Sequence, residues 1–260
     1  MGTSDRRSRM SACPLYAAML LASAAMVGAG VRPAAAQTAA GTADEHVAAL
    51  RRMLSDYGGL TRYGSENAEL PAPRAGERRV VFFGDDATER WQDPGLFAAG
   101  RYVNRGIGGQ NSAQLLLRFR QDVIGLAPAV VVIHAGSNDL ARMLGPGTRG
   151  TFADNIMSMT ELAKANRIRV VLASILPVCD CFRDQTSLRS PVRLADFNEW
   201  LRDYAGSAGA VYLDYFAALS EGRNFKEALT ADGLLPNAKG YAVMRPLAEA
   251  AIAEALKRPQ

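Results

Sequence analysis

Histidine is scarce in this chain. Its 260 residues contain only two, His46 and His134. Histidine is the side chain that most often moves protons near neutral pH, so chemistry that depends on an imidazole can use only these two positions. His134 lies in a run that indicates a strand, where a hydrogen-bonded structural histidine is the ordinary interpretation. His46 lies in a helical pattern, where a solvated side chain is expected. Neither is an evident base.

Long apolar runs are also missing. The longest, from Leu15 to Val31, has 17 residues, which is short for a membrane span. It follows three arginines and precedes Ala34-Ala35-Ala36, which is typical of a secretory signal peptide over residues 1–36 with cleavage before Gln37. A membrane anchor is the alternative. We expect a periplasmic or secreted protein with no membrane span after signal cleavage.

The sequence has little net charge once that segment is set aside. The formal charge is +4, but residues 1–36 hold four arginines and one aspartate, which leaves 26 basic and 25 acidic residues. No basic patch indicates nucleic-acid binding. Cys179 and Cys181 form a C-x-C pair, for which export favours a disulfide and the short loop disfavours one. Free thiols or a labile bond are therefore equally open, and no ligand cluster indicates a metal or a cofactor.

Strand and helix patterns alternate along most of the chain. An amphipathic helix and a linker are expected over residues 37–75, followed by one domain over 76–260. Short apolar runs predict strands at Arg79–Phe83, Tyr102–Asn104, Val130–His134, Arg169–Ile175 and Ala210–Leu213. Helical spacing predicts helices at Ser112–Leu126, Asn155–Asn166, Leu194–Tyr204 and Gly240–Leu256. This alternation favours an α/β fold, with a parallel sheet covered by helices on both faces and a ligand crevice at the carboxyl ends of the strands.

Four short motifs fall after these strands or before the last helix. They read GDDATERW from Gly84, NRGIGGQNS from Asn104, HAGSNDL from His134 and DGLLP from Asp232. In this order they resemble the SGNH or GDSL hydrolases, an esterase and lipase (acylhydrolase) family whose blocks read G-D-S, a glycine, G-x-N-D and D-G-x-H-P. The resemblance covers nearly everything from Arg79 to Ala255, and it implies a three-layer α/β/α fold with a five-stranded, flavodoxin-like parallel sheet.

The resemblance also assigns site residues. Asp86 stands at the position of the nucleophilic serine, and Leu235 stands at that of the histidine. Gly109 and Asn138 match the oxyanion-hole donors, and Asp232 matches the acid of the triad. The donors are retained, but the groups that attack the ester and carry the proton are replaced. We therefore expect a degenerate esterase that binds an acylated or carbohydrate ligand in the crevice, as a monomer, without metal or cofactor.

Other interpretations stay open. Asp86 could attack an ester itself, with an unrecognised base, in an active hydrolase that is lysophospholipase-like or a carbohydrate esterase. Carboxylates at 86 and 232 about 7–9 Å apart would suit an inverting glycosidase. A metal could be held by Asp85, Asp86, Asp139 and Asp232, although turn and backbone hydrogen bonds explain two of these better. Finally, the carboxylate of Asp86 could itself accept hydrogen bonds from Gly109 and Asn138 and so fill the hole.

Overall fold

The computed structural model describes residues 45–51, 54–97 and 100–259. These residues belong to two compact units, one ending at Leu54 and one beginning at Ser55. In the first unit residues 45–51 are helical, and Val47 and Leu50 are exposed. The signal peptide expected over residues 1–36 lies outside the described residues. Within those residues, no helix combines the length and apolar character that a membrane crossing requires.

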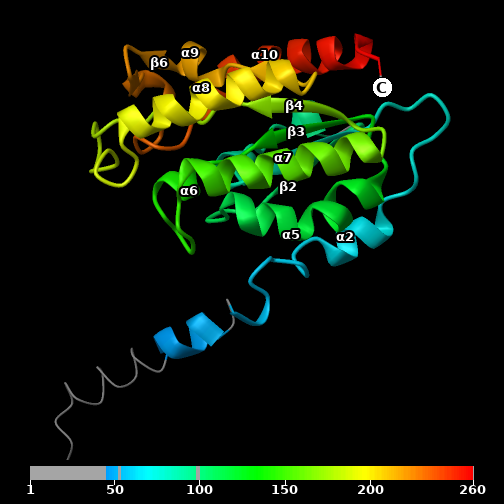
Figure 1. The fold of residues 1–260 in the computed structure, drawn as a ribbon, viewed down its shortest axis with the longest axis horizontal. Helices are drawn as coiled ribbons and strands as arrows, with labels where there is room; N and C mark the ends of the chain where they lie inside the picture. Colours follow the sequence, from blue (N-terminus) through cyan, green and yellow to red (C-terminus); the bar gives the residue numbers. More distant parts are fainter. Residues whose placement is uncertain (1–44, 52–53, 98–99, 260) are drawn as a thin grey trace, which may run out of the picture. The chain divides into compact units, whose positions relative to one another are not determined.

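A five-stranded parallel sheet forms the centre of the second unit (Figure 1). Its order is β2-β1-β3-β4-β5, which is the flavodoxin-like order. The strands are β1 (Val80–Gly84), β2 (Tyr102–Gly106), β3 (Val130–His134), β4 (Arg169–Ala173) and β5 (Val211–Leu213). Every residue of β1 and β3 is buried, because helices cover both faces of the sheet. The predicted fold class is confirmed.

The core consists of two apolar layers, one on each face of the sheet. Along β1, Val81 and Phe83 belong to one layer, while Val80 and Phe82 belong to the other. This alternation follows from the two-residue period of a strand. The first layer packs against α5 (Ser112–Asp122), α7 (Arg149–Ala165) and α8 (Pro191–Ser207). The second packs against α3 (Asp86–Glu89), α4 (Pro94–Phe97), α9 (Tyr215–Leu219) and α10 (Ala238–Lys257).

Two predicted helix boundaries move for local reasons. Helix α7 begins at Arg149, six positions before the predicted start, because Thr148 caps it in a reciprocal pair of hydrogen bonds with Thr151. Helix α5 ends at Asp122, and the chain continues as a 3-10 turn, η1 (Ile124–Leu126), before Ala127 takes a left-handed conformation. The remaining short elements are α2 (Gly64–Glu69), α6 (Ser137–Leu140), η2 (Glu227–Leu229) and the hairpin β6 (Ser220–Glu221) with β7 (Asn224–Phe225).

The segment that precedes β1 packs on the edge of the domain, where α2 runs beside α5 in Figure 1. The hydroxyl of Tyr63 donates to the carbonyl oxygen of Gly106 at 2.5 Å, and the Gln110 amide donates to that of Gly58 at 2.9 Å. Arg105 in β2 donates to the side chain of Asn67 at 2.8 Å. These contacts attach residues 58–67 to the edge strand and to the loop that contains Gly109.

Two glycines let α3 lie directly on the ends of the strands. A Cβ at Gly106 would lie 2.1 Å from the backbone nitrogen of Glu89, and one at Gly84 would lie 2.4 Å from the hydroxyl oxygen of Thr88; both contacts are with α3. Any side chain there would push α3 away from the sheet. The small residues therefore place Asp86, the first residue of α3, at the carboxyl edge of the sheet.

Candidate active site

The carboxylate of Asp86 accepts two hydrogen bonds through a single oxygen, Oδ2. The backbone N–H of Gly109 donates to it at 2.8 Å, and the side-chain amide of Asn138 donates at 2.8 Å. Gly109 has φ +76°, a left-handed conformation that glycine adopts without strain. The structure therefore brings three of the predicted site residues together, and the acidic side chain lies on the two predicted oxyanion donors.

Asn138 is held from both ends of its amide. Its nitrogen also donates to the carbonyl oxygen of Gln110 at 3.0 Å, and its oxygen accepts from Arg189 Nη2 at 3.4 Å. The side chain is buried. The next residue, Asp139, accepts from the backbone and the hydroxyl of Ser112, which ties α6 to the start of α5. These partners fix which end of the Asn138 amide faces Asp86.

Arg189 is a site residue that the sequence interpretation missed. It is buried, and its Nε donates to the hydroxyl of Ser137 at 2.9 Å. Burial lowers the pKa of the guanidinium, and the nearby carboxyls of Asp85 and Asp86 oppose that shift. A buried cation requires a compensating anion, and Asp86 bonds the same amide as Arg189 from its other end. No motif marks an arginine in a loop, so only the tertiary contact identifies it.

Asp232 and Leu235 lie on the turn before α10. Asp232 Oδ1 accepts from the backbone N–H of Leu234 at 3.0 Å and of Leu235 at 2.8 Å. Its other oxygen, Oδ2, accepts from Arg183 at 2.5 Å. Both oxygens of the carboxylate thus have hydrogen-bond partners. The half-buried Leu235 side chain packs against the second apolar layer and lines a small cavity together with Asp85, Asp86 and His134.

His134 is a buried structural residue at the end of β3. Burial lowers its pKa to about 4, although a backbone hydrogen bond with Ser174 opposes the shift. Its ring packs edge-on against Tyr215, and its Nδ1 lies 4.0 Å from Asp85 Oδ1. Asp85 is buried, which raises its pKa well above the ordinary value, and the charge of Asp86 adds to this effect. The imidazole is therefore neutral at neutral pH and faces a carboxyl that resists ionisation.

The four aspartates proposed for a metal do not converge. Asp139 is bonded to Ser112, and Asp232 is paired with Arg183. Among residues 45–51, 54–97 and 100–259, no group of three or more acidic, cysteine or histidine side chains is arranged to hold a metal ion.

The C-x-C pair forms a disulfide, Cys179–Cys181. It starts a loop that ends at Ser190, just before α8. The backbone N–H of Cys179 donates to the carbonyl oxygen of Gly233 at 2.9 Å, which joins this loop to the turn that carries Asp232. The disulfide loop, residues 179–190, therefore supplies both arginines of the site, Arg183 to Asp232 and Arg189 to Asn138.

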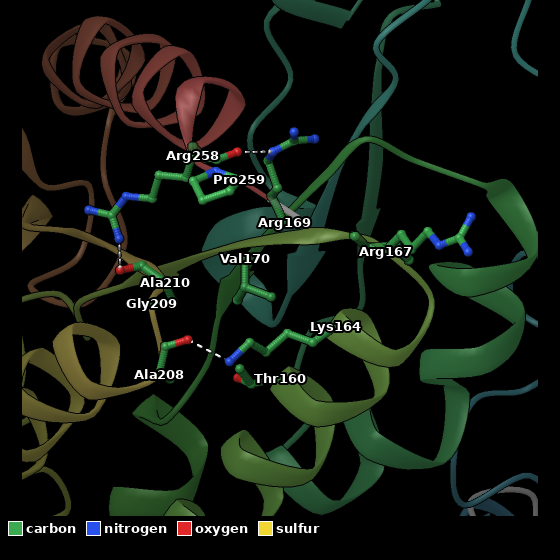
Figure 2. A pocket seen from close by; sticks show the side chains of 12 residues that line it. Thr160, Lys164, Arg167, Arg169, Val170, Ala208, Gly209, Ala210, Arg258 and Pro259 are labelled. Atoms are coloured by element: carbon green, nitrogen blue, oxygen red, sulfur yellow. Dashed lines mark hydrogen bonds between the residues drawn. The ribbon is translucent and has the colours of Figure 1, made fainter.

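A second hollow lies at the amino ends of β4 and β5 (Figure 2). Asp86, by contrast, lies just after the carboxyl end of β1. Three cationic side chains of the hollow bond backbone carbonyl oxygens: Lys164 that of Ala208 at 2.7 Å, Arg258 that of Ala210 at 2.7 Å, and Arg169 that of Arg258 at 2.9 Å. They bind the turn that follows α8 and the end of α10. This hollow is separate from the candidate site.

Comparisons with known proteins agree with the fold and the motifs. A candidate acylhydrolase from Bacteroides fragilis is 42% identical, with a TM-score of 0.73 over 77% of this chain and 99% of that one. A GDSL-like lipase from Bacteroides thetaiotaomicron is 39% identical, with a TM-score of 0.72 over 76% of this chain and 99% of that one. An uncharacterized lipoprotein of Bacillus subtilis, YqeF, is 30% identical over 82 residues, which are 30% of this chain and 33% of that protein.

The family comparison spans most of the second unit. The GDSL-like lipase/acylhydrolase family matches residues 72–243, a range that contains all five strands of the sheet and all four motifs. The resemblance predicted from those motifs is confirmed, and this chain belongs to the GDSL-like lipase/acylhydrolase family.

Proposed function

We propose that this protein is a degenerate member of the acylhydrolase family, which has lost ester hydrolysis and acts as an exported binding module. The observation that carries the proposal is the position of the Asp86 carboxylate on the Gly109 and Asn138 donors. In a serine hydrolase these donors stabilise the oxyanion of the reacting ester. Here an anion of the protein itself occupies them, so a substrate carbonyl would have to displace a charged group.

The residues at the two positions where a base would be expected support the same proposal. Leu235 has no atom that accepts a proton, and its N–H, not its side chain, contacts Asp232. His134 is buried, and its side chain is hydrogen-bonded to the backbone of Ser174. Loss of both nucleophile and base leaves a hydrolase with about 10³ to 10⁴-fold acceleration over water. The ligand proposed for the crevice is an acylated or carbohydrate molecule, recognised without cleavage.

Ester turnover tests this proposal. The mature chain should hydrolyse nitrophenyl acetate and butyrate at near-background rates, and fluorophosphonate probes should not label it. An active GDSL-like lipase assayed in parallel is the positive control. Efficient turnover by the wild-type chain would contradict the proposal.

An active hydrolase with Asp86 as nucleophile is the second candidate. The observation in its favour is that Asp86 and His134 line the same small cavity. In that case turnover should disappear in Asp86→Ala and in His134→Gln, and mass spectrometry should detect an acyl adduct on Asp86. Activity that survives Asp86→Ala would eliminate this candidate.

Export is supported by the pattern of residues 1–36 and by the similarity to a lipoprotein. Mass spectrometry of protein from the periplasm or the medium should give an amino terminus near Gln37. Retention of residues 1–36 on membrane-bound material would contradict this part of the proposal.

A further inference from the structure

The charge balance around Asn138 suggests what kind of group its site accepts. Asp86 and Arg189 contact opposite ends of the Asn138 amide: the nitrogen donates to Asp86 at 2.8 Å, and the oxygen accepts from Arg189 at 3.4 Å. A hydrogen bond from a cation to an amide oxygen polarises the amide, so its N–H becomes a stronger donor. Arg189 thereby strengthens the bond that Asn138 offers to an anion.

The carboxyl groups near Arg189 differ in their own partners and surroundings. Asp232 is paired with Arg183. Burial and the neighbouring Asp86 raise the pKa of Asp85 well above its usual value, so this carboxyl resists ionisation. Asp139 bonds Ser112 at the far side of α6. Asp85 and Asp86 are the two carboxyls that most oppose the effect of burial on Arg189, and of these two Asp86 is the one that bonds the same Asn138 amide.

We propose that Gly109, Asn138 and Arg189 form a carboxylate-binding site, which in this chain is occupied by its own Asp86 side chain. Gly109 and Asn138 supply the two donors at one oxygen. Arg189 is a positioning residue that orients the Asn138 amide and supplies the positive charge, so the site prefers a carboxylate to a neutral carbonyl. The inference rests on the proposed function only in taking Asp86 as the present occupant.

An external ligand that uses this site therefore has to displace Asp86 or to be similar to it. The adjoining cavity is small, and Leu176, Leu234 and Leu235 line it together with polar residues that include Asp85, His134 and Ser137. The chemistry that matches is therefore a carboxylate on a very small body. A free short-chain acid has this chemistry, and acetate is its simplest probe.

The experiment removes Asp86 and measures acetate binding directly. In ¹⁵N-labelled Asp86→Ala protein, the amide resonance of Gly109 should shift saturably with acetate and much less with acetamide at equal concentration. In the wild-type chain it should not shift, because Asp86 occupies the site. Adding Arg189→Gln should weaken acetate binding about tenfold or more, the usual worth of a hydrogen bond that involves a charged group.

Two further variants test whether acetate binding depends on Arg189 in particular or on the loss of any arginine. Asp86→Ala with Arg189→Lys keeps the charge but loses the planar donor pair, and it should bind acetate with intermediate affinity while still preferring it to acetamide. Asp86→Ala with Arg202→Gln removes an arginine of α8 that pairs with Asp214, and it should bind acetate like Asp86→Ala.

Three outcomes would overturn the inference: equal binding of acetate and acetamide, unchanged affinity after Arg189→Gln, or a wild-type response equal to that of Asp86→Ala. If Arg189→Gln prevents folding, the lysine variant decides, and loss of its preference for acetate over acetamide would be the negative result. Ester turnover by the wild-type chain would defeat the proposed function without altering these titrations, so the two failures are distinguishable.

Discussion

Asp232 is bound by Arg183 and not by an imidazole. Arg183 Nη2 lies 2.5 Å from Asp232 Oδ2, and both N–H groups that reach Oδ1 come from the backbone of its own turn. A carboxylate that stands at the position of a triad acid has thus acquired a different cation. The side chain of Arg183 is 63% exposed, so this pair is of the weak surface type and can be exchanged.

Restoration of the triad is predicted to depend on Arg183. Asp86→Ser or Leu235→His alone should give almost no hydrolysis, because a serine without a base and an imidazole without a nucleophile are each ineffective. The two together should be strongly non-additive. Adding Arg183→Gln should raise kcat/KM further, since the new imidazole no longer competes for Asp232 Oδ2. Turnover of nitrophenyl acetate is the measurement.

The controls for restoration are Arg183→Gln alone, which should stay inactive, and Asp232→Ala in the restored chain, which should remove most of the gain. A folded double variant that is as inactive as the single variants would show that Gly109, Asn138 and Asp232 do not surround one reacting carbon.

The charge of Asp86 is predicted to stabilise the fold through Arg189. In Asp86→Asn the amide oxygen can accept both bonds that now reach Oδ2, so the geometry is kept and only the charge is lost. We expect a loss of about 1–3 kcal/mol in the free energy of unfolding, measured with urea, because the buried guanidinium loses one of its two nearby counter-charges.

A double-mutant cycle tests whether this loss of stability arises from the interaction between Asp86 and Arg189. Asp86→Asn and Arg189→Gln should couple by about 1 kcal/mol or more, while Asp86→Asn and Arg202→Gln should be additive. Additivity in the first cycle would mean that Asp86 is balanced by another group.

His134 is predicted to make the protein sensitive to mild acid. Its pKa in the folded state is about 4, below the value of about 6.5 in an unfolded chain. As the pH falls, the unfolded state therefore binds a proton before the folded state does. The contribution of the neutral His134 to the free energy of unfolding is full above about pH 6.5 and falls as pH drops towards 4. The shift corresponds to roughly 3 kcal/mol at most.

The raised pKa values of Asp85 and Asp139 act in the opposite direction, because these carboxyls take up protons more readily in the folded state. The test is therefore a comparison with His134→Gln. The free energy of unfolding should fall more steeply between pH 6.5 and 4.5 in the wild type than in the variant. Parallel curves would contradict the prediction.

Close packing of α3 on the sheet predicts that position 106 does not tolerate a side chain. Gly106→Ala should destabilise the fold by about 3 kcal/mol or more, because the new Cβ would meet the backbone of Glu89 at 2.1 Å and backbone cannot swing aside. Gly64→Ala is the matched control, since it opens α2 and its Cβ would have no neighbour within 4 Å in the described structure. Thermal unfolding of both variants is the measurement, and similar melting temperatures would refute the close approach.

The architecture could be predicted from local patterns in the sequence. Runs such as Val80–Phe83 and Val130–Ile133 are apolar on both faces, and that pattern by itself specifies buried parallel strands. The predicted helix boundaries were less accurate. The start of α7 depends on Thr148 and Thr151, two ordinary residues whose reciprocal capping is visible only in their geometry.

The candidate site, too, could be predicted from the sequence only in part. The sequence by itself determined that Asp86, Gly109, Asn138, Asp232 and Leu235 follow or precede the elements that bring them to one edge of the sheet, because chain order and strand direction are local properties. Only the tertiary structure decided that Asp86 accepts from Gly109 and Asn138 and that Arg183 binds Asp232. It also brought Arg189 to the Asn138 amide. Each of these contacts joins residues at least 23 positions apart, and hydrogen bonds across such separations depend on how loops close over the sheet, which residue spacing does not encode.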